Sequence, residues 1–139
     1  MISNVKKIKF PVRGDEHGRL VIQEGASDVC PFDIKRTFFI FGTTPGTVRG
    51  KHAHHKTRQL LICTSAACTI ECEMPDGSKG DYRLDWPDKG LLVEDMVWHN
   101  MKEFSKDAVL LVLSSEHYDD SDYVRNYEDF KLFCKEAEK

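Results

Sequence analysis

The chain is divided into many short segments rich in aliphatic, β-branched and aromatic residues, and turn-forming residues separate them. The segments expected to form strands are residues 19–24, 34–41, 48–54, 58–64, 68–74, 79–86, 90–93 and 109–114. Between two of them, Pro75-Asp-Gly77 is typical of a hairpin turn, because proline presets φ and glycine accepts a positive φ. Many short strands joined by turns predict a mainly β fold, either a sandwich or a barrel.

The two ends of the chain need a separate interpretation. Near the C-terminus, aromatic and sulfur-bearing side chains recur every three or four residues, at Tyr127, Phe130, Phe133 and Cys134. This spacing predicts an amphipathic helix over residues 123–139, capped by Ser121 or Asp122 and packed against the outside of the sheet. At the other end, residues 5–12 are expected to form an edge strand or a strand exchanged with a second subunit.

Length and charge narrow the possible functions. A chain of 139 residues is typical of one domain, here residues 1–139. The net charge of −3 argues against nucleic-acid binding. Residues 1–70 hold 11 Lys and Arg against 5 Asp and Glu, whereas residues 71–139 hold 9 against 18. The basic half could bind an anionic small molecule, or it could simply present a solvated charged surface.

The sequence also bears on location. The longest purely apolar run covers residues 108–113, whereas a membrane-spanning helix needs about 20 residues, so no membrane association is expected. Residues 1–9 are polar and lysine-rich, which argues against a signal peptide. The five cysteines include no Cys-x-x-Cys pair, which argues against a zinc knuckle or a thioredoxin-like site. We therefore expect a cytoplasmic protein with reduced thiols.

The segment best suited to catalysis or ligand binding is Arg49-Gly-Lys-His-Ala-His-His-Lys56. In a strand, residues two apart face the same side, so His52 and His54 are expected to point together, with Ala53 and His55 on the other face. Two imidazoles directed into one cavity can bind a metal or transfer protons near neutral pH. The alternative is a pair of surface histidines in a polar loop. The pair stands at the entry to an apolar strand, and this position disfavours the alternative.

This spacing resembles the first motif of the cupins, in which a glutamate follows the His-x-His pair by five residues. Position 59 holds Gln here instead of Glu. The histidine of the second cupin motif is matched by His99, although Asp95-Met-Val97 replaces the usual Pro-x-Gly before it. The resemblance implies a cupin, or jelly-roll, antiparallel β-barrel followed by a C-terminal helix. It keeps the histidine positions of a metal site but lacks the anionic ligand.

A narrower resemblance covers nearly the whole chain. The matching segments are Pro31–Arg36, Arg49–His54, Gln59–Cys63, Gly90–Leu91, Val97–His99, Val109–Ser114 and Tyr118–Tyr127. In these segments the chain resembles the sugar-nucleotide 3,4-ketoisomerases that act on dTDP-4-keto-6-deoxyglucose. The Arg-Gly-x-His piece is also similar to the related dTDP-sugar 3,5-epimerases. The chain departs from the ketoisomerases at Phe38 and Phe39, where tyrosines are usual, and at His117, while His17 occupies a variable position.

The resemblance implies an isomerase of deoxysugar biosynthesis, serving glycans such as O-antigen or S-layer, that moves the keto group from C4 to C3 through an enediol. It assigns His52 and His54 as the catalytic pair, Arg49 to the pyrophosphate, and Arg36 to the nucleotide. Gln59 and His99 are expected to line the sugar pocket. No cofactor is expected, because the chain has neither a Gly-x-Gly-x-x-Gly nor a P-loop pattern. The resemblance also implies a homodimer.

Three other functions stay open at this point. A metal-dependent cupin enzyme would use His52, His54, His99 and Gln59, although the missing carboxylate weakens such a site, and we predict that no metal is bound. An isomerase similar to the dTDP-sugar 3,5-epimerases would use the same Arg-Gly-x-His segment. A non-enzymatic sugar-nucleotide binder is the third, because fold alone does not fix activity.

Overall fold

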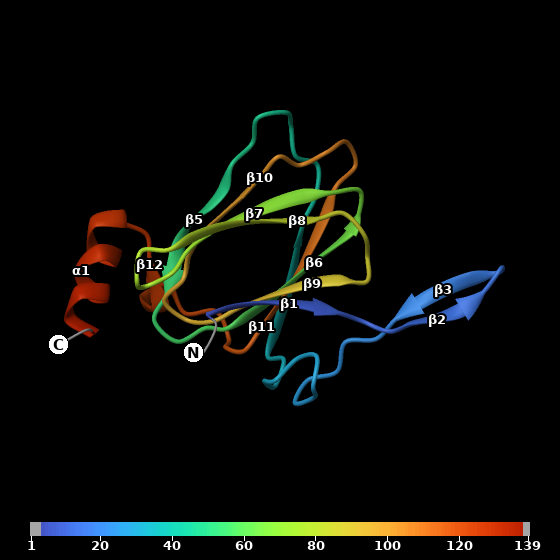
Figure 1. The fold of residues 1–139 in the computed structure, drawn as a ribbon, viewed down its shortest axis with the longest axis horizontal. Coiled ribbons are helices and arrows are strands. Elements are labelled where there is room, and N and C mark those ends of the chain that lie inside the picture. Colours follow the sequence, from blue (N-terminus) through green and yellow to red (C-terminus); the bar gives the residue numbers. More distant parts are fainter. Residues whose placement is uncertain (1–3, 138–139) are drawn as a thin grey trace.

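The computed structural model describes residues 4–137, which form two facing five-stranded sheets, a two-stranded ribbon and one helix. The strands are β1 (Val5–Lys9), β2 (Val12–Asp15), β3 (Gly18–Val21), β4 (Arg36–Ile40), β5 (Arg49–His54), β6 (Gln59–Ser65), β7 (Cys68–Glu73), β8 (Lys79–Leu84), β9 (Lys89–Val93), β10 (Trp98–Lys102), β11 (Val109–Ser114) and β12 (Tyr123–Val124). A 3-10 turn (Asp120–Asp122) precedes β12, and helix α1 (Tyr127–Ala137) follows it (Figure 1).

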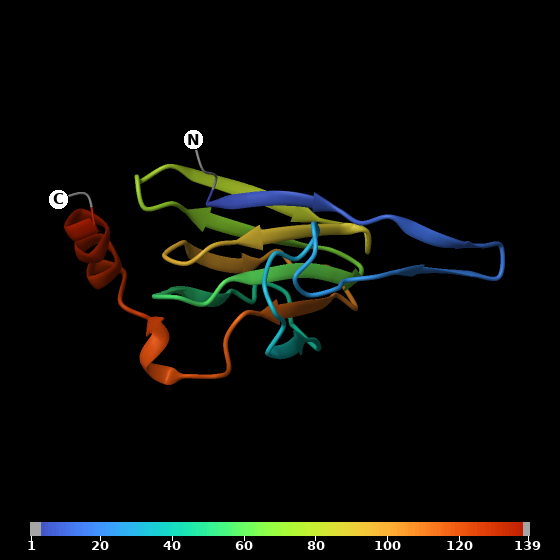
Figure 2. The same cartoon turned by 90° about the horizontal axis from the view of Figure 1, so that it is seen from below.

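All strand pairs in both sheets are antiparallel. The first sheet has the order β1-β9-β6-β11-β4, and the second has the order β12-β5-β10-β7-β8. The chain passes repeatedly from one sheet to the other, so strands distant in sequence become neighbours, as β11 does with β4 and β6. The two sheets lie face to face, one above the other in Figure 1, and in Figure 2 their strands overlap in the direction of view. Among the described strands, no hydrogen-bonded pair joins one sheet to the other into a continuous barrel.

The main core fills the space between the two sheets. Its fully buried members include Leu61, Ile70, Leu91, Leu110 and Val112. A second cluster, with Phe10, Phe32, Leu60 and Ile62 among its members, covers the opposite face of the first sheet. Alternate residues of β6 therefore contribute to different clusters, as expected from the two-residue repeat of a strand.

Helix α1 packs on the outer face of β5, as predicted. Phe130 and Cys134 are buried together with Ala53 and Val124. The expected start of the helix at residue 123 is wrong, because β12 occupies this position and the helix begins at Tyr127. The side chain of Asn126 accepts a hydrogen bond from the Asp129 amide and caps the helix. The expected end at residue 139 lies outside the described residues.

The predicted caps, Ser121 and Asp122, belong instead to the 3-10 turn that precedes β12. Asp122 is buried, and its carboxylate accepts hydrogen bonds from the loop after β5. An aspartate already engaged in this way is not available to cap a helix.

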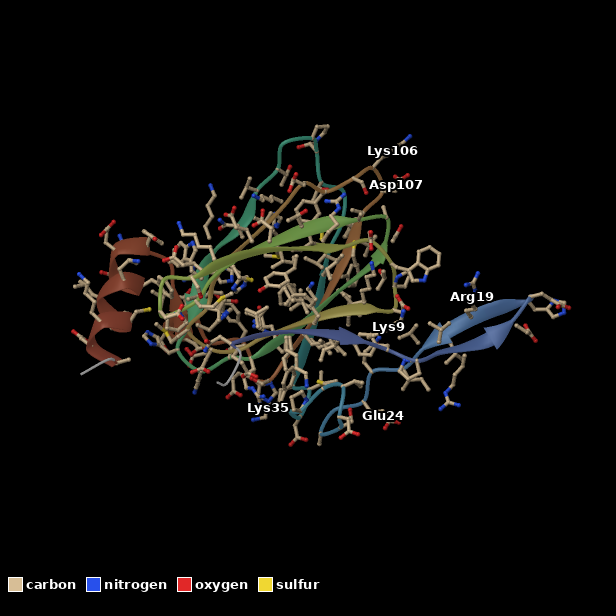
Figure 3. All side chains as sticks on the ribbon, in the orientation of Figure 1. Lys9, Arg19, Glu24, Lys35, Lys106 and Asp107 are labelled. Atoms are coloured by element: carbon tan, nitrogen blue, oxygen red, sulfur yellow. The ribbon has the colours of Figure 1, made fainter. Side chains whose placement is uncertain are left out.

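The β2–β3 ribbon projects away from the two sheets, on the side of the molecule opposite α1 (Figure 1). Its residues pair in the register Val12↔Val21 to Asp15↔Gly18, and nearly all of them are exposed. Figure 3 shows Arg19 on this ribbon, well separated from the side chains that fill the space between the sheets. β1 runs before the ribbon and forms an edge of the first sheet, which agrees with the edge-strand alternative for residues 5–12.

The predicted mainly β fold with a C-terminal helix is confirmed, and each segment expected as a strand overlaps one. Strands β2, β10 and β12 were not predicted as separate strands. Among residues 4–137, no helix is long and apolar enough to span a membrane. Cys30, Cys63, Cys68 and Cys72 are buried as thiols.

Candidate active site

Three histidine side chains meet between the sheets at one end of the core. His52 and His54 come from β5, and His99 comes from the neighbouring strand β10. The ring centroid of His52 lies 4.9 Å from that of His54 and 4.7 Å from that of His99. One ring nitrogen from each residue lies within 4.8 Å of the others. The predicted convergence of His52 and His54 is therefore confirmed, and His55 lies on the opposite face against Phe133.

A β-bulge in β5 directs His52 into this cluster. Gly50 has a φ of +90°, and Lys51 also has a positive φ, of 59°. A Cβ atom at position 50 would lie 2.8 Å from the carbonyl oxygen of His99, so only glycine fits there. The register shifts at this point: His99 pairs with His52, whereas the next residue, Asn100, pairs with Gly50. Bulges of this kind reorient a side chain, which explains why Arg-Gly precedes the histidine pair.

Backbone hydrogen bonds fix the protonated ring nitrogen of two histidines. His52 Nδ1 lies 3.1 Å from the carbonyl oxygen of Gly50, and His99 Nδ1 lies 3.1 Å from that of Val97. Because a carbonyl only accepts, each Nδ1 carries the hydrogen and donates it. The neutral rings therefore present an unprotonated Nε2. Among residues 4–137, the buried Nε2 atoms of His54 and His99 have no hydrogen-bond partner.

Burial strongly disfavours the charged form of these imidazoles. It lowers the pKa of His52 to about 3 and the pKa of His54 to about 2, with a further contribution from the positive charge that His99 would carry. Burial also lowers the pKa of His99 itself, which is 1% exposed. All three rings are therefore neutral at pH 7 and can accept a proton or a hydrogen bond.

A cavity of about 260 Å³ opens beside the cluster. Its lining residues are Phe38, Phe39, Ile40, Arg49, Gly50, His52, Gln59, His99, Met101, Val112 and Tyr123. The predicted site residues Arg49, Gln59 and His99 thus share one cavity with His52. Gln59 is 3% exposed, and its Nε2 lies 3.4 Å from Ser114 Oγ. Among the described residues that line this cavity, no side chain is acidic.

Arginine side chains surround the site. Arg36 lies with its guanidinium 5.5 Å from the ring centroids of both Phe38 and Tyr118, and its buried Nε has no hydrogen-bond partner within the described part of the chain. Arg36 and Arg125 are among the positive charges that lower the pKa of His54. The structure thus places Arg36 and Arg49, which were predicted to bind the nucleotide and the pyrophosphate, near the histidines, and the sequence interpretation missed Arg125, which comes from the tail.

Tyr123 is the second site residue that the sequence interpretation missed. Its ring centroid lies 5.1 Å from that of His52 and 4.6 Å from that of His54. The helical spacing of the tail had placed this tyrosine at the start of a helix. The acidic run Asp119-Asp-Ser-Asp122 directly before it forms a short 3-10 turn, with Asp119 accepting a hydrogen bond from the Ser121 amide, and Tyr123 then continues in extended conformation.

The three histidines also have the spacing of metal ligands. Three neutral nitrogens are suitable for zinc, iron, nickel or copper. The remaining polar groups fit less well, because Gln59 supplies an amide where a carboxylate would hold a divalent ion. The arrangement is thus consistent with proton transfer and with metal binding, and the surrounding arginines favour an anionic ligand.

Comparisons with known proteins complete the description of the site. The family model described as "FdtA: WxcM-like, C-terminal" matches residues 3–135. The chain is 41% identical over 129 residues to the TDP-4-oxo-6-deoxy-alpha-D-glucose-3,4-oxoisomerase of Aneurinibacillus thermoaerophilus, covering 92% of this chain and 91% of that protein.

Solved structures show the same similarity. The sugar 3,4-ketoisomerase QdtA from Thermoanaerobacterium thermosaccharolyticum, in complex with TDP, superposes with a TM-score of 0.92 at 39% identity, over 99% of this chain and 98% of that one. A histidine-to-asparagine mutant of QdtA is solved in complex with TDP-4-keto-6-deoxyglucose. The rmlC epimerase of Mycobacterium tuberculosis shares the fold alone, with a TM-score of 0.73 at 14% identity, over 88% of this chain and 68% of that one.

Proposed function

Because the chain belongs to the FdtA (WxcM-like, C-terminal) family, we propose that it isomerises TDP-4-keto-6-deoxyglucose by moving the keto group from C4 to C3. The predicted ketoisomerase family, the enzyme class and the cupin-like β fold are confirmed. The site residues and their roles stay proposals. The observation that carries them is the pair of neutral histidines on β5, one with its Nε2 available beside a cavity that Arg49 lines.

The reaction needs proton transfers only. The C4 carbonyl acidifies the C3–H bond, and His52 Nε2 takes this proton while the electron pair forms a C3=C4 double bond and the C4 oxygen becomes an enediolate oxygen. Protonation at C4, together with transfer of the C3 hydroxyl proton to the C4 oxygen, then gives a C3 carbonyl and a C4 hydroxyl. Atoms and electrons balance without an oxidant or reductant. A positioned base contributes about 10²–10⁴-fold to such a step.

His54 is proposed to deliver or relay the second proton, because it faces the same side of β5 as His52. Arg49 is proposed to bind the pyrophosphate and Arg36 the nucleotide, since a guanidinium offers two parallel hydrogen bonds to phosphate oxygens. The negative charge of the bound phosphates would raise the pKa of the histidines from their low values toward the range in which imidazole exchanges protons efficiently. Gln59 and His99 are proposed to hydrogen-bond the sugar oxygens.

The test is incubation of the protein with TDP-4-keto-6-deoxyglucose, with the sugar followed by NMR. Loss of the C3 proton signal and appearance of a new proton at C4 are expected. In D₂O, deuterium should appear at C4 unless one base carries the proton across without exchange. Unchanged substrate, with no signal loss at C3, would overturn the proposal, whereas epimerisation at C3 or C5 would assign the site to 3,5-epimerase-like chemistry.

The three-histidine cluster favours a metal-dependent cupin enzyme as the second candidate. Metal analysis of the purified protein separates the two. Stoichiometric zinc, iron or nickel, with activity lost on chelation and restored by that metal, would support this candidate over the metal-free isomerase.

We also propose that the protein is a homodimer. The β2–β3 ribbon exposes Val12 and Leu20, with exposed fractions of 42% and 53%, and Ile22 directly after it is 48% exposed, so a second subunit would cover these apolar side chains. Light scattering at micromolar concentration should report twice the chain mass, and the mass of a single chain would contradict the proposal. A single domain over residues 1–139 and a cytoplasmic location stay predictions.

A further inference from the structure

We infer that Tyr123 is a positioning residue for the histidine pair, and that Asp122 holds it in place. The inference rests on the proposed function, since it concerns the same two histidines. It also gives a role to the tail motif Asp119–Arg125, which the proton-transfer chemistry leaves unexplained.

Tyr123 touches both members of the pair at once. Its ring meets His52 at an interplanar angle of 73°, with the centroids 5.1 Å apart, and it meets His54 at 59°, with the centroids 4.6 Å apart. Edge-to-face and tilted contacts at these distances are the favoured arrangements of aromatic rings. On a strand, each histidine could rotate about χ1, so a ring that contacts both of them restricts both rotations together.

The backbone brings Tyr123 to this position by pairing with the catalytic strand. Strand β12 lies antiparallel to β5, with Tyr123 opposite His54 and Val124 opposite Ala53. With only two residues, β12 is too short to hold itself on the edge of a sheet. Val124 is buried with Ala53 and Phe130 on the outer face, so the side chains of β12 alternate between the helix side and the histidine side.

Asp122 supplies the attachment that the short strand lacks. Its carboxylate accepts hydrogen bonds from the amide of Lys56 at 2.9 Å, from the amide of Thr57 at 3.2 Å, and from the hydroxyl of Thr57. The carbonyl of Asp122 also accepts a hydrogen bond from the His55 amide at 2.9 Å. Asp122 is 5% exposed, and hydrogen bonds to a buried carboxylate are stronger than those between neutral groups. These bonds join the tail to the loop that follows the histidines.

Arg125 acts on the ring itself. Its guanidinium carbon lies 4.2 Å from the Tyr123 ring centroid, and Asp120 holds that guanidinium at 2.9 Å. The ring is thus in contact with the histidines and with a cation that is itself anchored. The contact is made by the ring and not by the hydroxyl, so the inference predicts that phenylalanine replaces Tyr123 with little loss.

The experiment first compares three single variants of the full chain. Tyr123→Phe should keep kcat within about threefold of wild type, whereas Tyr123→Leu should lower kcat by about 10- to 100-fold, a smaller loss than removal of a base. The dissociation constant of TDP, measured by calorimetry, should stay unchanged in both. Tyr127→Leu is the matched control, because Tyr127 is also a tail tyrosine but contacts Trp98 and Phe130 instead of the histidines. It should change thermal stability without changing kcat.

A second readout does not depend on turnover. In long-range ¹H–¹⁵N spectra, the ring signals of His52 and His54 should move in Tyr123→Leu and stay in place in Tyr123→Phe and Tyr127→Leu. This readout remains valid if the protein proves inactive on the keto-sugar, so failure of the proposed function and failure of this inference are distinguishable.

Asp122→Asn tests the attachment. Because Asp122 is inferred to act through Tyr123, the double variant Asp122→Asn/Tyr123→Leu should lose no more kcat than the worse single variant. Additive losses would overturn the role of Asp122. Normal kcat and unmoved histidine signals in folded Tyr123→Leu would overturn the role of Tyr123, and a large loss in Tyr123→Phe would assign the effect to the hydroxyl instead.

Discussion

The inward-facing rows of the two sheets are apolar at one end and polar at the other. On β6 the row runs from Cys63 and Leu61 to Gln59, and on β11 it runs from Leu110 and Val112 to Ser114. On β10, Met101 belongs to the apolar core, whereas His99 lies in the histidine cluster. The same strands therefore build a packed core and a reactive pocket.

The difference shows how the fold supports its own site. The apolar end buries side chains with no polar atoms to satisfy, and it supplies stability. The polar end instead lowers stability, because the buried Nε2 atoms of His54 and His99 have no hydrogen-bond partner among the described residues. An unsatisfied buried polar group costs about 1–3 kcal/mol. The core thus offsets the cost of keeping unprotonated imidazoles ready for a ligand.

The largest expected effect is at the polar end. His52→Asn keeps a polar side chain but removes the base, so kcat should fall by about 10²–10⁴-fold. The affinity for TDP should not change, because Arg49 and not His52 is proposed to meet the phosphates. Turnover of TDP-4-keto-6-deoxyglucose by NMR and TDP calorimetry measure the two quantities.

His55→Asn is the matched control for His52→Asn. His55 belongs to the same sequence segment but lies on the other face of the sheet, against Phe133. Its variant should keep full turnover. Near-normal turnover in folded His52→Asn would remove His52 as the base, and an unfolded His52→Asn would assign a structural role to this histidine.

The apolar end should respond in the opposite way. Leu61 is fully buried between the sheets, so Leu61→Ala should lower the free energy of unfolding by about 2–5 kcal/mol. At a temperature where this variant remains folded, its kcat should equal that of wild type. Urea unfolding and turnover of the same sample test both statements. A kcat loss as large as that of His52→Asn would show that the two ends are not independent.

The two ends also differed in how well the sequence predicted them. The pairing of His52 with His54 follows from the two-residue repeat of a strand, which needs no knowledge of distant contacts. The resemblance to cupins located His99 and Gln59. In contrast, β10 was not predicted as a strand, because its sequence from Trp98 to Lys102 is largely polar. Its central place in the second sheet depends on pairing with both β5 and β7.

Tyr123 could not be predicted for a related reason. The tail has helical spacing, and local periodicity extends the helix back to residue 123. The hydrogen bonds of Asp122 to Lys56 and Thr57, more than 60 residues away in the chain, override that local preference. Arg125 was missed for the same reason, because its position depends on β12 being extended. Contacts distant in sequence therefore decided the parts of the site that were missed.

The third-largest expected effect is the dependence of the free energy of unfolding on pH. His54 is 3% exposed, and its pKa falls to about 2 in the folded protein, against about 6.5 in an unfolded chain. Between these values the unfolded state binds more protons, so the free energy of unfolding should fall as the pH decreases below 6.5. Each such group contributes a slope of at most about 1.4 kcal/mol per pH unit.

Urea unfolding between pH 4.5 and 6.5 measures this dependence, to which the lowered pKa values of His52 and His99 also contribute, so the His54 share is obtained by comparison with a variant. His54→Gln should flatten the slope, whereas His117→Gln, an exposed histidine outside the pocket, serves as the surface control. An equal slope in wild type and His54→Gln would contradict a buried, neutral His54.

The smallest expected effect is that of metal removal. The cavity offers three neutral imidazoles, and no acidic side chain lines it within residues 4–137, while Arg36, Arg49 and Arg125 lie nearby. A divalent cation would thus meet no opposite charge in the pocket and several like charges around it. Chelation should leave kcat unchanged, and purified protein should hold no stoichiometric metal.

Gln59→Glu sharpens the comparison, since it adds the missing carboxylate to the cavity that His52 and His99 share. This variant should take up zinc or nickel more tightly than wild type, and bound metal at the histidines should lower ketoisomerase activity by occupying the nitrogen lone pairs that accept the proton. Equal metal uptake by wild type and Gln59→Glu, with activity that depends on the metal, would show that the histidines alone suffice and would replace proton transfer by metal chemistry.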